Sequence, residues 1–446
     1  MNWKGLMLRM PDWGRLHVTR RARIGVAVVA GLLLSLPLAG AWASVQGAGG
    51  TTVGYGWGNN RSGQLGDDTT VNRLTPASMV GLDGVVTMAV GPTHGLVLLS
   101  TGAVRSWGHN RSGQLGDGGT TDRAAPGPVA GVSGATRVAA GGAFSVALES
   151  NGAVVAWGNN ASGQLGDGSA PTDHASPVAA SGLGPGSGVV EIAAGASHAL
   201  ALKSDGSVLA WGNNASGQLG TGDAPSDHLT PIAVTALGAG SGVVAIAAGD
   251  TFSLALKSDG SVLAWGNNAS GQLGDGSAPA DHATPVASLA AGSGVVRIVG
   301  GGTHSLALTS DGHVYAWGNN ASGQVGNGLA PTDQPLPVLL GGLPRIVDVA
   351  AGRAHTVAVA SDGTVFSWGD NVLGQLGDGT TTKRATPGGV TGLAAGSTIV
   401  AVFAAGDHTH ALVGGGSVAR PAAQSQAPAT KAPATKAVVT GPRTAG

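Results

Sequence analysis

The chain has 446 residues, of which 80 are glycine and none is cysteine, and 11% carry a charged side chain. The lack of cysteine excludes disulfides, thiolate metal sites and cysteine nucleophiles, while a hydrophobic content of 42% is too high for a disordered chain. Residues 1–43 carry a net charge of +5 and residues 417–446 one of +4, so the body between them carries −10. Such an acidic body is a poor surface for nucleic-acid phosphates, which require a clustered basic footprint.

Residues 1–43 have the pattern of an export signal. Three arginines between residues 20 and 23 precede an uncharged, mostly apolar stretch from Ile24 to Leu38, and Ala41-Trp42-Ala43 then supplies a small-x-small pattern. We expect cleavage after Ala43 and a secreted, periplasmic or cell-envelope location. The alternative is an uncleaved membrane anchor, because the stretch up to Ala43 is just long enough to span a bilayer.

Seven copies of one phrase follow. Each begins with Trp-Gly, continues in the manner of GNNASGQLGDG, and lies 50 to 54 residues from the next. A period near fifty with short strands and glycine-rich turns is typical of a radial or solenoidal repeat architecture. We expect the seven tryptophans to be structural, filling the wedge between neighbouring units. They are Trp57, Trp107, Trp157, Trp211, Trp265, Trp317 and Trp368.

The unit from 243 to 276 predicts four strands. Residues 243–248 are a short apolar run that fits a strand buried on both faces, and residues 252–256 alternate large with small side chains, which predicts a second strand of period two. Asp259-Gly260 predicts a two-residue hairpin in which both residues need positive φ. Residues 261–265 form the third strand, and an outer segment follows the glycine-rich loop. Four antiparallel strands of this kind make one propeller blade.

The two ends of the repeat region are complementary half-units. The region begins with a Trp-Gly strand at 51–58 and ends with the other half of a unit at 399–413. We predict that they pair and remove the exposed sheet edges. The predicted fold is therefore all-β: a closed seven-bladed β-propeller over 44–416, with four antiparallel strands per blade. Residues 417–446, rich in Ala, Pro, Thr and Lys, are predicted to be a disordered tail.

The combination of A-G-x-x-H, a D-G turn and W-G-x-N-x-x-G-Q-L-G-x-G resembles the repeats of the regulator of chromosome condensation family over about residues 51–413. The resemblance implies a seven-bladed propeller but no single role, because members act in nucleotide exchange on a small GTPase, in ultraviolet-B reception and in β-lactamase inhibition. The even Trp spacing leaves no room for the exchange factor's wedge insertion. With two Tyr and four Phe, the chain also lacks the photoreceptor's clustered aromatics. The exported bacterial inhibitor is the member that fits best.

Two further sets of repeated side chains are interpreted as structural. The His of A-G-x-x-H is replaced by Phe144 and Phe252 in two units, which favours packing with a ring-nitrogen hydrogen bond over catalysis. The asparagines of the N-x-S sequons, of which Asn60 is the first, are interpreted as turn residues that bond the local backbone. The histidines of the motif are His94, His198, His304, His355 and, shifted by one residue, His410.

A third set, 16 or 17 residues after each Trp, varies within a nearly fixed frame. In a closed ring its three arginines would lie on adjacent blades, and so would its three histidines, which gain charge below about pH 6.5. We expect this set to bind the partner; the alternative is a ring of solvated loop residues. The partner-binding residues are Arg73, Arg123, Arg384, His174, His228 and His282, and Gln334 takes the seventh position.

Nothing in the sequence resembles a nucleophile elbow, a phosphate loop or a pair of catalytic carboxylates, and equivalent residues on separate blades are too far apart for a zinc site. We therefore expect no enzyme, cofactor or metal. The leading hypothesis is a monomeric, extracytoplasmic, non-catalytic module that binds a protein or cell-envelope partner through one face, with inhibition of a secreted enzyme as a narrower version. The alternatives are an enzyme such as a lyase or glycan hydrolase, and a guanine-nucleotide exchange factor. We expect no nucleic acid partner, and membrane contact only if residues 1–43 stay attached.

Overall fold

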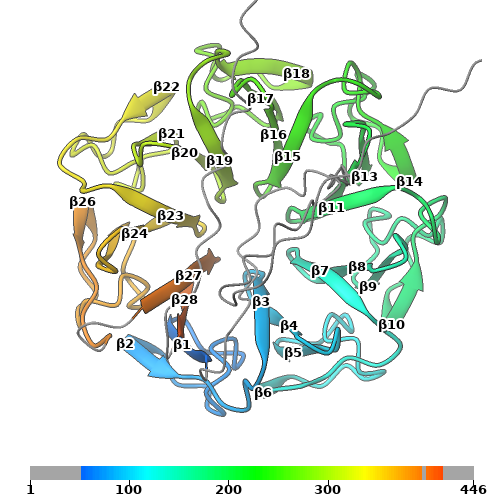
Figure 1. The fold of residues 1–446 in the computed structure, drawn as a ribbon, viewed down its shortest axis with the longest axis horizontal. Helices are drawn as coiled ribbons and strands as arrows, with labels where there is room; N and C mark the ends of the chain where they lie inside the picture. The colour runs from blue at the N-terminus through cyan, green and yellow to red at the C-terminus, as the bar shows by residue number, and fades with distance from the viewer. Residues whose placement is uncertain (1–51, 394–397, 415–446) are drawn as a thin grey trace, which may run out of the picture. The chain divides into compact units, whose positions relative to one another are not determined.

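The computed structural model describes residues 52–393 and 398–414, which form 28 β-strands in seven four-stranded antiparallel sheets. The sheets stand around a central axis as the blades of a propeller (Figure 1). This confirms the predicted fold class. The predicted signal in residues 1–43 and the predicted tail at 417–446 lie outside the described residues.

The blades are numbered 1 to 7 in the order of their tryptophans, from Trp57 to Trp368. Within a blade the four strands are described in order from the axis outward. The inner strands of blades 1 to 7 are β27 (Thr398–Ala405), β3 (Val85–Val90), β7 (Ala135–Ala140), β11 (Val189–Ala194), β15 (Val243–Ala248), β19 (Val295–Gly300) and β23 (Ile346–Ala351). The second strands are β28 (His408–Gly414), β4 (His94–Leu99), β8 (Phe144–Glu149), β12 (His198–Lys203), β16 (Phe252–Lys257), β20 (His304–Thr309) and β24 (His355–Ala360).

The two remaining positions in each blade lie further from the axis. The third strands are β1 (Thr52–Gly58), β5 (Val104–Gly108), β9 (Val154–Gly158), β13 (Val208–Gly212), β17 (Val262–Gly266), β21 (Val314–Gly318) and β25 (Val365–Gly369). The outer strands are β2 (Arg73–Ser78), β6 (Arg123–Pro128), β10 (His174–Ala179), β14 (His228–Ala233), β18 (His282–Leu289), β22 (Gln334–Leu339) and β26 (Arg384–Gly389).

Blade 1 closes the ring by joining the two ends of the repeat region. Its sheet order is β2-β1-β28-β27, and β1 pairs with β28 without interruption from Thr52 opposite Gly414 to Gly58 opposite His408. The predicted closure is thus confirmed. The N-terminal side contributes two strands, because β2 forms the outer edge of the same sheet.

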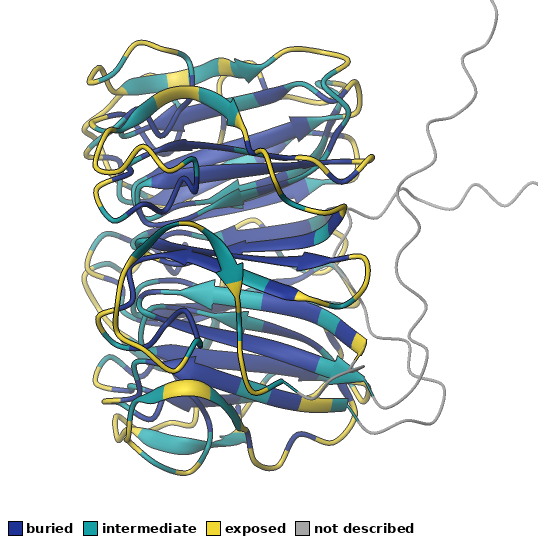
Figure 2. Ribbon diagram, turned by 90° about the vertical axis from the view of Figure 1, so that its left-hand side faces the viewer, coloured by how far each residue is buried: buried dark blue, intermediate teal, exposed yellow. Residues whose placement is uncertain are grey.

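The burial of the two strands nearest the axis differs from the sequence prediction. The second strand β16 is buried from Phe252 to Leu256, on both faces, whereas the inner strand β15 buries only Val243 and Ile246 fully. The predictions of a doubly buried inner strand and a period-two second strand were wrong, since the inner strand faces the axis while the second lies between neighbouring sheets. Figure 2 shows the resulting buried interior, with exposed residues mainly in loops and outer strands.

The hairpin turns also differ from the prediction. In blade 5 the N–H of Lys257 donates to the Ser261 carbonyl and the N–H of Gly260 to the Lys257 carbonyl, both over 2.9 Å. Gly260 has φ +85°, whereas Asp259 does not adopt positive φ. The turn is therefore a three-residue loop ending in a left-handed glycine, not the predicted two-residue hairpin. The Asp259 carboxylate favours it by accepting the Ser261 N–H over 2.9 Å.

Two faces result from this strand order. We call the loop face the one that carries the turns from inner to second strand and the loops from third to outer strand, such as 91–93 and 109–122 in blade 2. The hairpin face carries the opposite turns. The outer edges of the blades are protected because a proline lacks the N–H needed to extend a sheet. Each outer strand has one in an equivalent position: Pro76, Pro126, Pro177, Pro231, Pro285, Pro337 and Pro387.

Candidate functional site

The long loops of the loop face are fixed by a buried asparagine. In blade 1 the Asn60 side chain accepts the Leu65 N–H over 2.9 Å and donates to the Asp67 carboxylate over 2.9 Å. Asn60 and its six equivalents are fully buried. The interpretation of these asparagines as turn residues is therefore confirmed. Each of these loops therefore has a fixed conformation before any partner binds.

Each loop also binds the next blade. The Gln64 carbonyl of blade 1 accepts the indole N–H of Trp107 in blade 2 over 2.8 Å. Gly63 of the same loop lies so close to Ala124 that a Cβ would be 2.5 Å from the Ala124 Cα, and its φ is +77°. Only glycine permits this approach. All seven tryptophans are fully buried and donate to the equivalent carbonyl of the preceding blade, at 2.8 to 3.0 Å.

Histidines add a second bond across four of the blade boundaries. His94 Nε2 lies 3.0 Å from Ser145 Oγ of the next blade, and this hydroxyl donates to the Gln114 carbonyl over 2.8 Å. His198, His304 and His355 make equivalent contacts with a hydroxyl at 2.8 to 3.0 Å. All four are fully buried, which fits the packing role inferred from the His and Phe exchange.

The boundary between blades 1 and 2 departs from this pattern. His408, not His410, begins the second strand and pairs with Gly58 as His94 pairs with Gly108. The assignment of His410 to the motif was therefore wrong, because the preceding turn is one residue shorter. Gly95 stands where Ser145 stands in blade 3, so no hydroxyl faces His408, and neither of its ring nitrogens has a hydrogen-bond partner among the described residues. Burial and the neighbouring His410 ring, 5.2 Å away, hold its pKa well below the ordinary value.

The predicted partner-binding residues all lie on the loop face, each at the first position of an outer strand. Blade 1, which carries Arg73, lies between blade 7 with Arg384 and blade 2 with Arg123. His174, His228 and His282 lie on blades 3, 4 and 5. The two sectors are thus placed next to each other around the ring, with Gln334 of blade 6 between the last histidine and the first arginine.

Each predicted arginine is paired within its own blade. Arg73 contacts the Asp67 carboxylate at 2.8 Å, Arg123 contacts Asp117 at 3.3 Å and Arg384 contacts Asp378 at 3.5 Å. Burial raises the pKa of Asp67, but hydrogen bonds from Thr69, Arg73 and Asn60 outweigh it and leave the pKa below its ordinary value. The arginine sector is therefore largely neutralised by its own loops.

Backbone contacts hold two of these arginines further. Arg123 and Arg384 each donate to a carbonyl of their third strand, Ser106 and Ser367, over 3.0 Å. Burial lowers the pKa of Arg123, and Asp117 opposes this effect. Sequence spacing revealed neither the acids nor these carbonyls.

Each predicted histidine also contacts an aspartate of its own loop, and in blade 4 this aspartate, Asp223, lies two residues beyond the position used in blades 3 and 5. His174 Nε2 lies 3.2 Å from the Asp167 carboxylate and 3.1 Å from Ser169 Oγ, which itself donates to Asp167 over 2.6 Å. The three residue types match a hydrolase triad, but the arrangement does not. A catalytic histidine bridges Ser and Asp through its two different nitrogens, whereas here one nitrogen serves both.

Charged side chains are unevenly distributed over the loop face. Arg61 of blade 1 and Arg111 of blade 2 are exposed and form no ion pair among the described residues. Blades 2 to 6 have an aspartate directly before each outer strand, and each accepts a backbone N–H of its loop over 2.8 Å. These are Asp122, Asp173, Asp227 and Asp281, which are exposed, and the half-buried Asp333. On blades 1 and 2 the exposed Asp68 and Asp122 balance the two arginines, whereas the loops from third to outer strand of blades 3 to 6 contain no Lys or Arg. The face therefore has a neutral and an acidic side.

The inner strands contain charges that sequence reasoning missed. Arg297 of blade 6 forms an ion pair with the buried Asp348 of blade 7, and Asp348 also accepts the Val402 N–H over 3.1 Å. Arg137 interacts with Glu191 of the next blade, while its burial lowers its pKa. All four residues take the third position of an inner strand. Comparing that position among the repeats would have found them.

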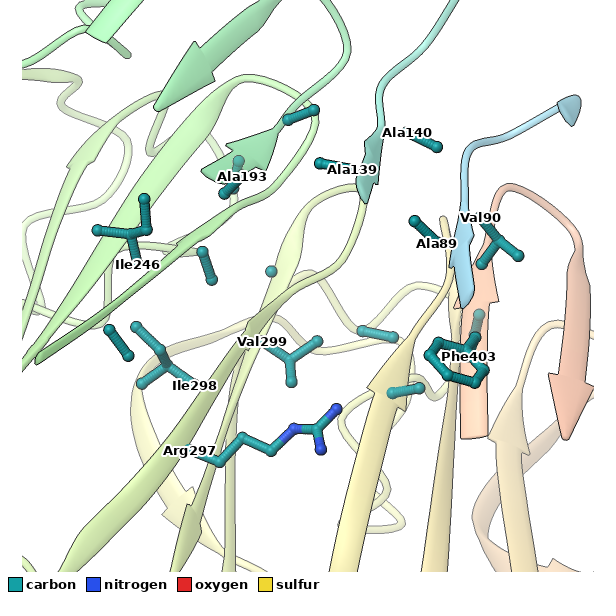
Figure 3. A pocket seen from close by; sticks show the side chains of 18 of the residues that line it. Ala89, Val90, Ala139, Ala140, Ala193, Ile246, Arg297, Ile298, Val299 and Phe403 are labelled. Carbon is teal, nitrogen blue, oxygen red and sulfur yellow. The ribbon is translucent and has the colours of Figure 1, made fainter. Parts of the chain in front are cut away.

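These strands surround an axial cavity of about 190 Å³. Its wall is mostly apolar, and Figure 3 shows the Arg297 side chain below Ile298 and Val299. At the loop face a smaller cavity of about 90 Å³ lies between the glycine-rich turns, and Arg353 of one of these turns donates to Asp407 of the next blade over 2.8 Å. The ion pairs inside the channel leave it close to neutral.

In residues 52–393 and 398–414 no three His, Asp or Glu side chains gather in an arrangement that could hold a metal ion. The same part of the chain has no helix with the length and apolarity needed to cross a membrane.

Comparison with known proteins matched family models along most of the propeller. The RCC1-like domain model matches residues 173–420, and the regulator of chromosome condensation (RCC1) repeat model matches residues 55–98 and 101–148. A second RCC1 repeat model matches residues 85–114 and 135–164.

Two curated relatives match about half of the chain. The human E3 ubiquitin-protein ligase HERC2 is 36% identical over 245 residues, which are 54% of this chain and 5% of HERC2. The ultraviolet-B receptor UVR8 of Arabidopsis thaliana is 39% identical over 199 residues, 44% of each protein. The chain thus matches less than half the length of these relatives.

Solved structures match nearly the whole propeller. Prp20p of Saccharomyces cerevisiae has a TM-score of 0.74 at 26% identity, covering 83% of this chain and 93% of Prp20p, and was described with its binding to Gsp1p and histones. Human WBSCR16 has a TM-score of 0.72 at 25% identity, covering 81% of this chain and 98% of its own.

Proposed function

The chain belongs to the RCC1 repeat family, and on that premise we propose that it is an extracytoplasmic, non-catalytic module that binds a protein partner through its loop face. Binding of protein partners has been described for a relative, since Prp20p binds Gsp1p and histones. Fold alone does not identify the partner. The proposal therefore depends on the surface of this chain.

The observation that carries the proposal is the uneven distribution of charged side chains over loops of fixed conformation. Asn60 and its equivalents fix each loop, and the tryptophans fix each loop to the next blade. On this frame the unpaired Arg61 and Arg111 are balanced by Asp68 and Asp122 on blades 1 and 2, while the loops of blades 3 to 6 carry aspartates and no Lys or Arg. Electrostatic complementarity with such a surface sets partner choice and orientation. We infer that the partner carries a basic patch that faces blades 3 to 6 and acidic groups opposite Arg61 and Arg111.

The extracytoplasmic location is supported by the pattern of residues 1–43, in which basic residues precede an apolar stretch and Ala41-Trp42-Ala43. In that location the partner is a secreted protein or a component of the cell envelope, and inhibition of a secreted enzyme is the narrower form of the proposal. We propose that the module acts as a monomer. Intact mass of the exported protein tests cleavage after Ala43; a membrane-bound species that retains residues 1–43 would support the anchor instead.

The test of function is affinity capture from the native envelope or medium, followed by direct binding of the captured protein. We expect saturable binding that weakens as salt increases, because the contacts are charged, and that falls in the Arg61→Ala, Arg111→Ala variant. A panel of glycan and ester substrates is tested in parallel. Turnover of a panel substrate without any captured partner would overturn the proposal in favour of an enzyme.

A further inference from the structure

Blade 6 differs from its neighbours at the outer rim. Blades 3 and 5 place Asp, Ser and His in their loops and outer strands, at Asp275, Ser277 and His282 in blade 5. Blade 6 replaces this hydrogen-bonded set with Asn327, Leu329 and Gln334. Compared with blade 5, blade 6 therefore lacks one carboxylate and one imidazole and has a leucine in place of the serine.

Two more leucines follow on the outer strand β22. Leu336 and Leu339 stand where blade 5 has Thr284 and Ala287. The exposed fraction of the residue is 58% for Leu329, 57% for Leu336 and 50% for Leu339. We call these three leucines the blade-6 rim. Exposed apolar side chains that gather in one place indicate an interaction site, whereas single ones do not.

A groove runs beside the blade-6 rim. It has a volume of about 580 Å³, and its walls include Leu329, Val338 and Leu339 of blade 6 together with Phe366 and Pro387 of blade 7. On the other side of the strand, Leu336 lies beside Gly276 of blade 5. The rim therefore offers an apolar groove on one side and an apolar ridge on the other.

The loops beside the rim carry a net negative charge. In the loop and outer strand of blade 6, residues 319–339, there is a half-buried Asp333 and no Lys, Arg or His. Blade 5 adds Asp275 and Asp281 on the neighbouring loop, and on the other side Lys383 and Arg384 of blade 7 are each paired with an aspartate. A second copy of the chain would bring the same acids and another body of net charge −10 against them. Charge complementarity instead favours a basic partner.

The backbone of β22 limits how a partner can bind. Pro335 and Pro337 remove two of the N–H groups that an added strand would need. Side chains must therefore make the contact, with an apolar side chain in the groove and cations over the acids.

We propose that the blade-6 rim is a second docking surface, which takes a basic segment of a protein partner with leucine-sized apolar side chains. It lies at the outer edge of the propeller and shares Asp281 and Asp333 with the acidic side of the loop face, but its three leucines take no part in the function proposed above. The apolar contact gives affinity by desolvation, and the surrounding acids select for cationic sequences.

The test uses a fluorescent peptide of alternating Lys and Leu residues and the purified full chain, with binding measured by fluorescence anisotropy. We expect saturable binding that falls at least tenfold when Leu is replaced by Ser or Lys by Glu in the peptide. Equal binding of the Lys-Ser peptide would reduce the interaction to general electrostatic attraction and overturn the proposal. Equal binding of the Glu-Leu peptide would do the same for the charge argument.

The repeats supply the matched protein variants. Leu329→Ser, Leu336→Thr and Leu339→Ala together give blade 6 the residues of blade 5, and should lower affinity at least tenfold with the unfolding temperature unchanged. Leu229→Ala on blade 4 introduces the residue found at Ala175 and Ala283, and should leave binding unaltered.

Two measurements complete the test if the triple variant is unstable. Methyl NMR of the unmodified chain should show peptide-induced shifts at Leu329 and Leu339, and shifts confined to other leucines would place the site elsewhere. Sedimentation shows whether the chain dimerises with concentration. A dimer that the triple variant abolishes would assign the rim to self-association and overturn the proposal.

Discussion

Trp57 donates its indole N–H to the backbone carbonyl oxygen of Gln375 over 3.0 Å, although 318 residues separate them. Thr409 donates its hydroxyl to the same oxygen over 3.0 Å. One acceptor in blade 7 thus holds two strands of blade 1, as Gln114 holds Ser145 and Trp157 further along the chain. The closing boundary has the same bonds as an internal one.

Replacing Trp57 by Ala is expected to lower the free energy of unfolding by about 3–5 kcal/mol, the range for loss of a fully buried aromatic side chain. Urea denaturation measures the loss. Trp57→Phe should cost less, because it keeps most of the apolar contact and loses the hydrogen bond to Gln375. Deletion of residues 44–58, which removes β1, should have the largest effect. A deletion variant that unfolds at the temperature of the parent would disprove the closure.

Stability is expected to fall as pH falls from about 6.5 to 4. Burial lowers the pKa of His94, His198 and His304 to about 4, whereas unfolded histidine takes up a proton near 6.5. Within this window the unfolded state binds more protons, so lower pH favours unfolding, and the full stability is present above pH 6.5. Urea midpoints at pH 7.5 and 5.0 check this.

The same experiment has an internal control. His198→Phe introduces the residue that blades 3 and 5 carry, and should reduce the dependence of the urea midpoint on pH. An unchanged dependence would show that other groups cause it.

The arginine sector is expected to contribute to binding and to stability. Replacement of Arg73, Arg123 and Arg384 by Gln, the residue of blade 6, should weaken partner binding. The sequence alone predicts unchanged stability, but the contacts with Asp67, Asp117 and Asp378 lead us to expect a loss of about 1 kcal/mol for each. Calorimetry and a binding titration measure the two effects on the same variant.

Variants of the unpaired arginines distinguish the effect on binding from the effect on stability. Arg61→Ala with Arg111→Ala should weaken binding of the captured partner about tenfold without a change in unfolding temperature, because neither side chain forms an ion pair in the described part of the chain. An unaltered affinity would move the binding site to the hairpin face or to residues 417–446.

The ion pair in the channel is expected to behave as a unit. Removing Arg297 takes an ion-pair partner from the buried Asp348 and should cost up to about 3–5 kcal/mol. The double replacement by Ala should cost less than the sum of the single ones, because blades 5 and 1 carry Ala245 and Ala401 at this position. A double-mutant cycle of urea unfolding measures the coupling. Additive losses would show that the two side chains act independently.

The sequence predicts those parts of the fold that depend on repetition. Even spacing of the tryptophans gives the number of blades, and complementary half-units predict the pairing of Thr52–Gly58 with the C-terminal strands. It also predicts that Arg73, Arg123 and Arg384 share one sector. These conclusions need only the order of the repeats around a closed ring.

What the sequence does not reveal depends on the path of the loops and on contacts between blades. Asp67 meets Arg73 because Asn60 folds the loop back, and spacing alone does not show this. Arg297 and Asp348 lie 51 residues apart and meet only because the same strand position recurs around the axis. The sequence predicts the wrong one of the strands 243–248 and 252–257 to be buried on both faces. The reason is that a short apolar run has the same sequence pattern whether it lines a channel or lies between two sheets.

Blade 1 also determines how the propeller can be built into other polypeptides. Thr52 and Gly414 face each other in one β-ladder, so the chain enters and leaves the ring about 5 Å apart. A domain with adjacent ends can be spliced into a surface loop of a host protein without stretching either. The same geometry allows circular permutation: joining residues 52 and 414 through a short linker and opening another hairpin should give new termini with the ring intact.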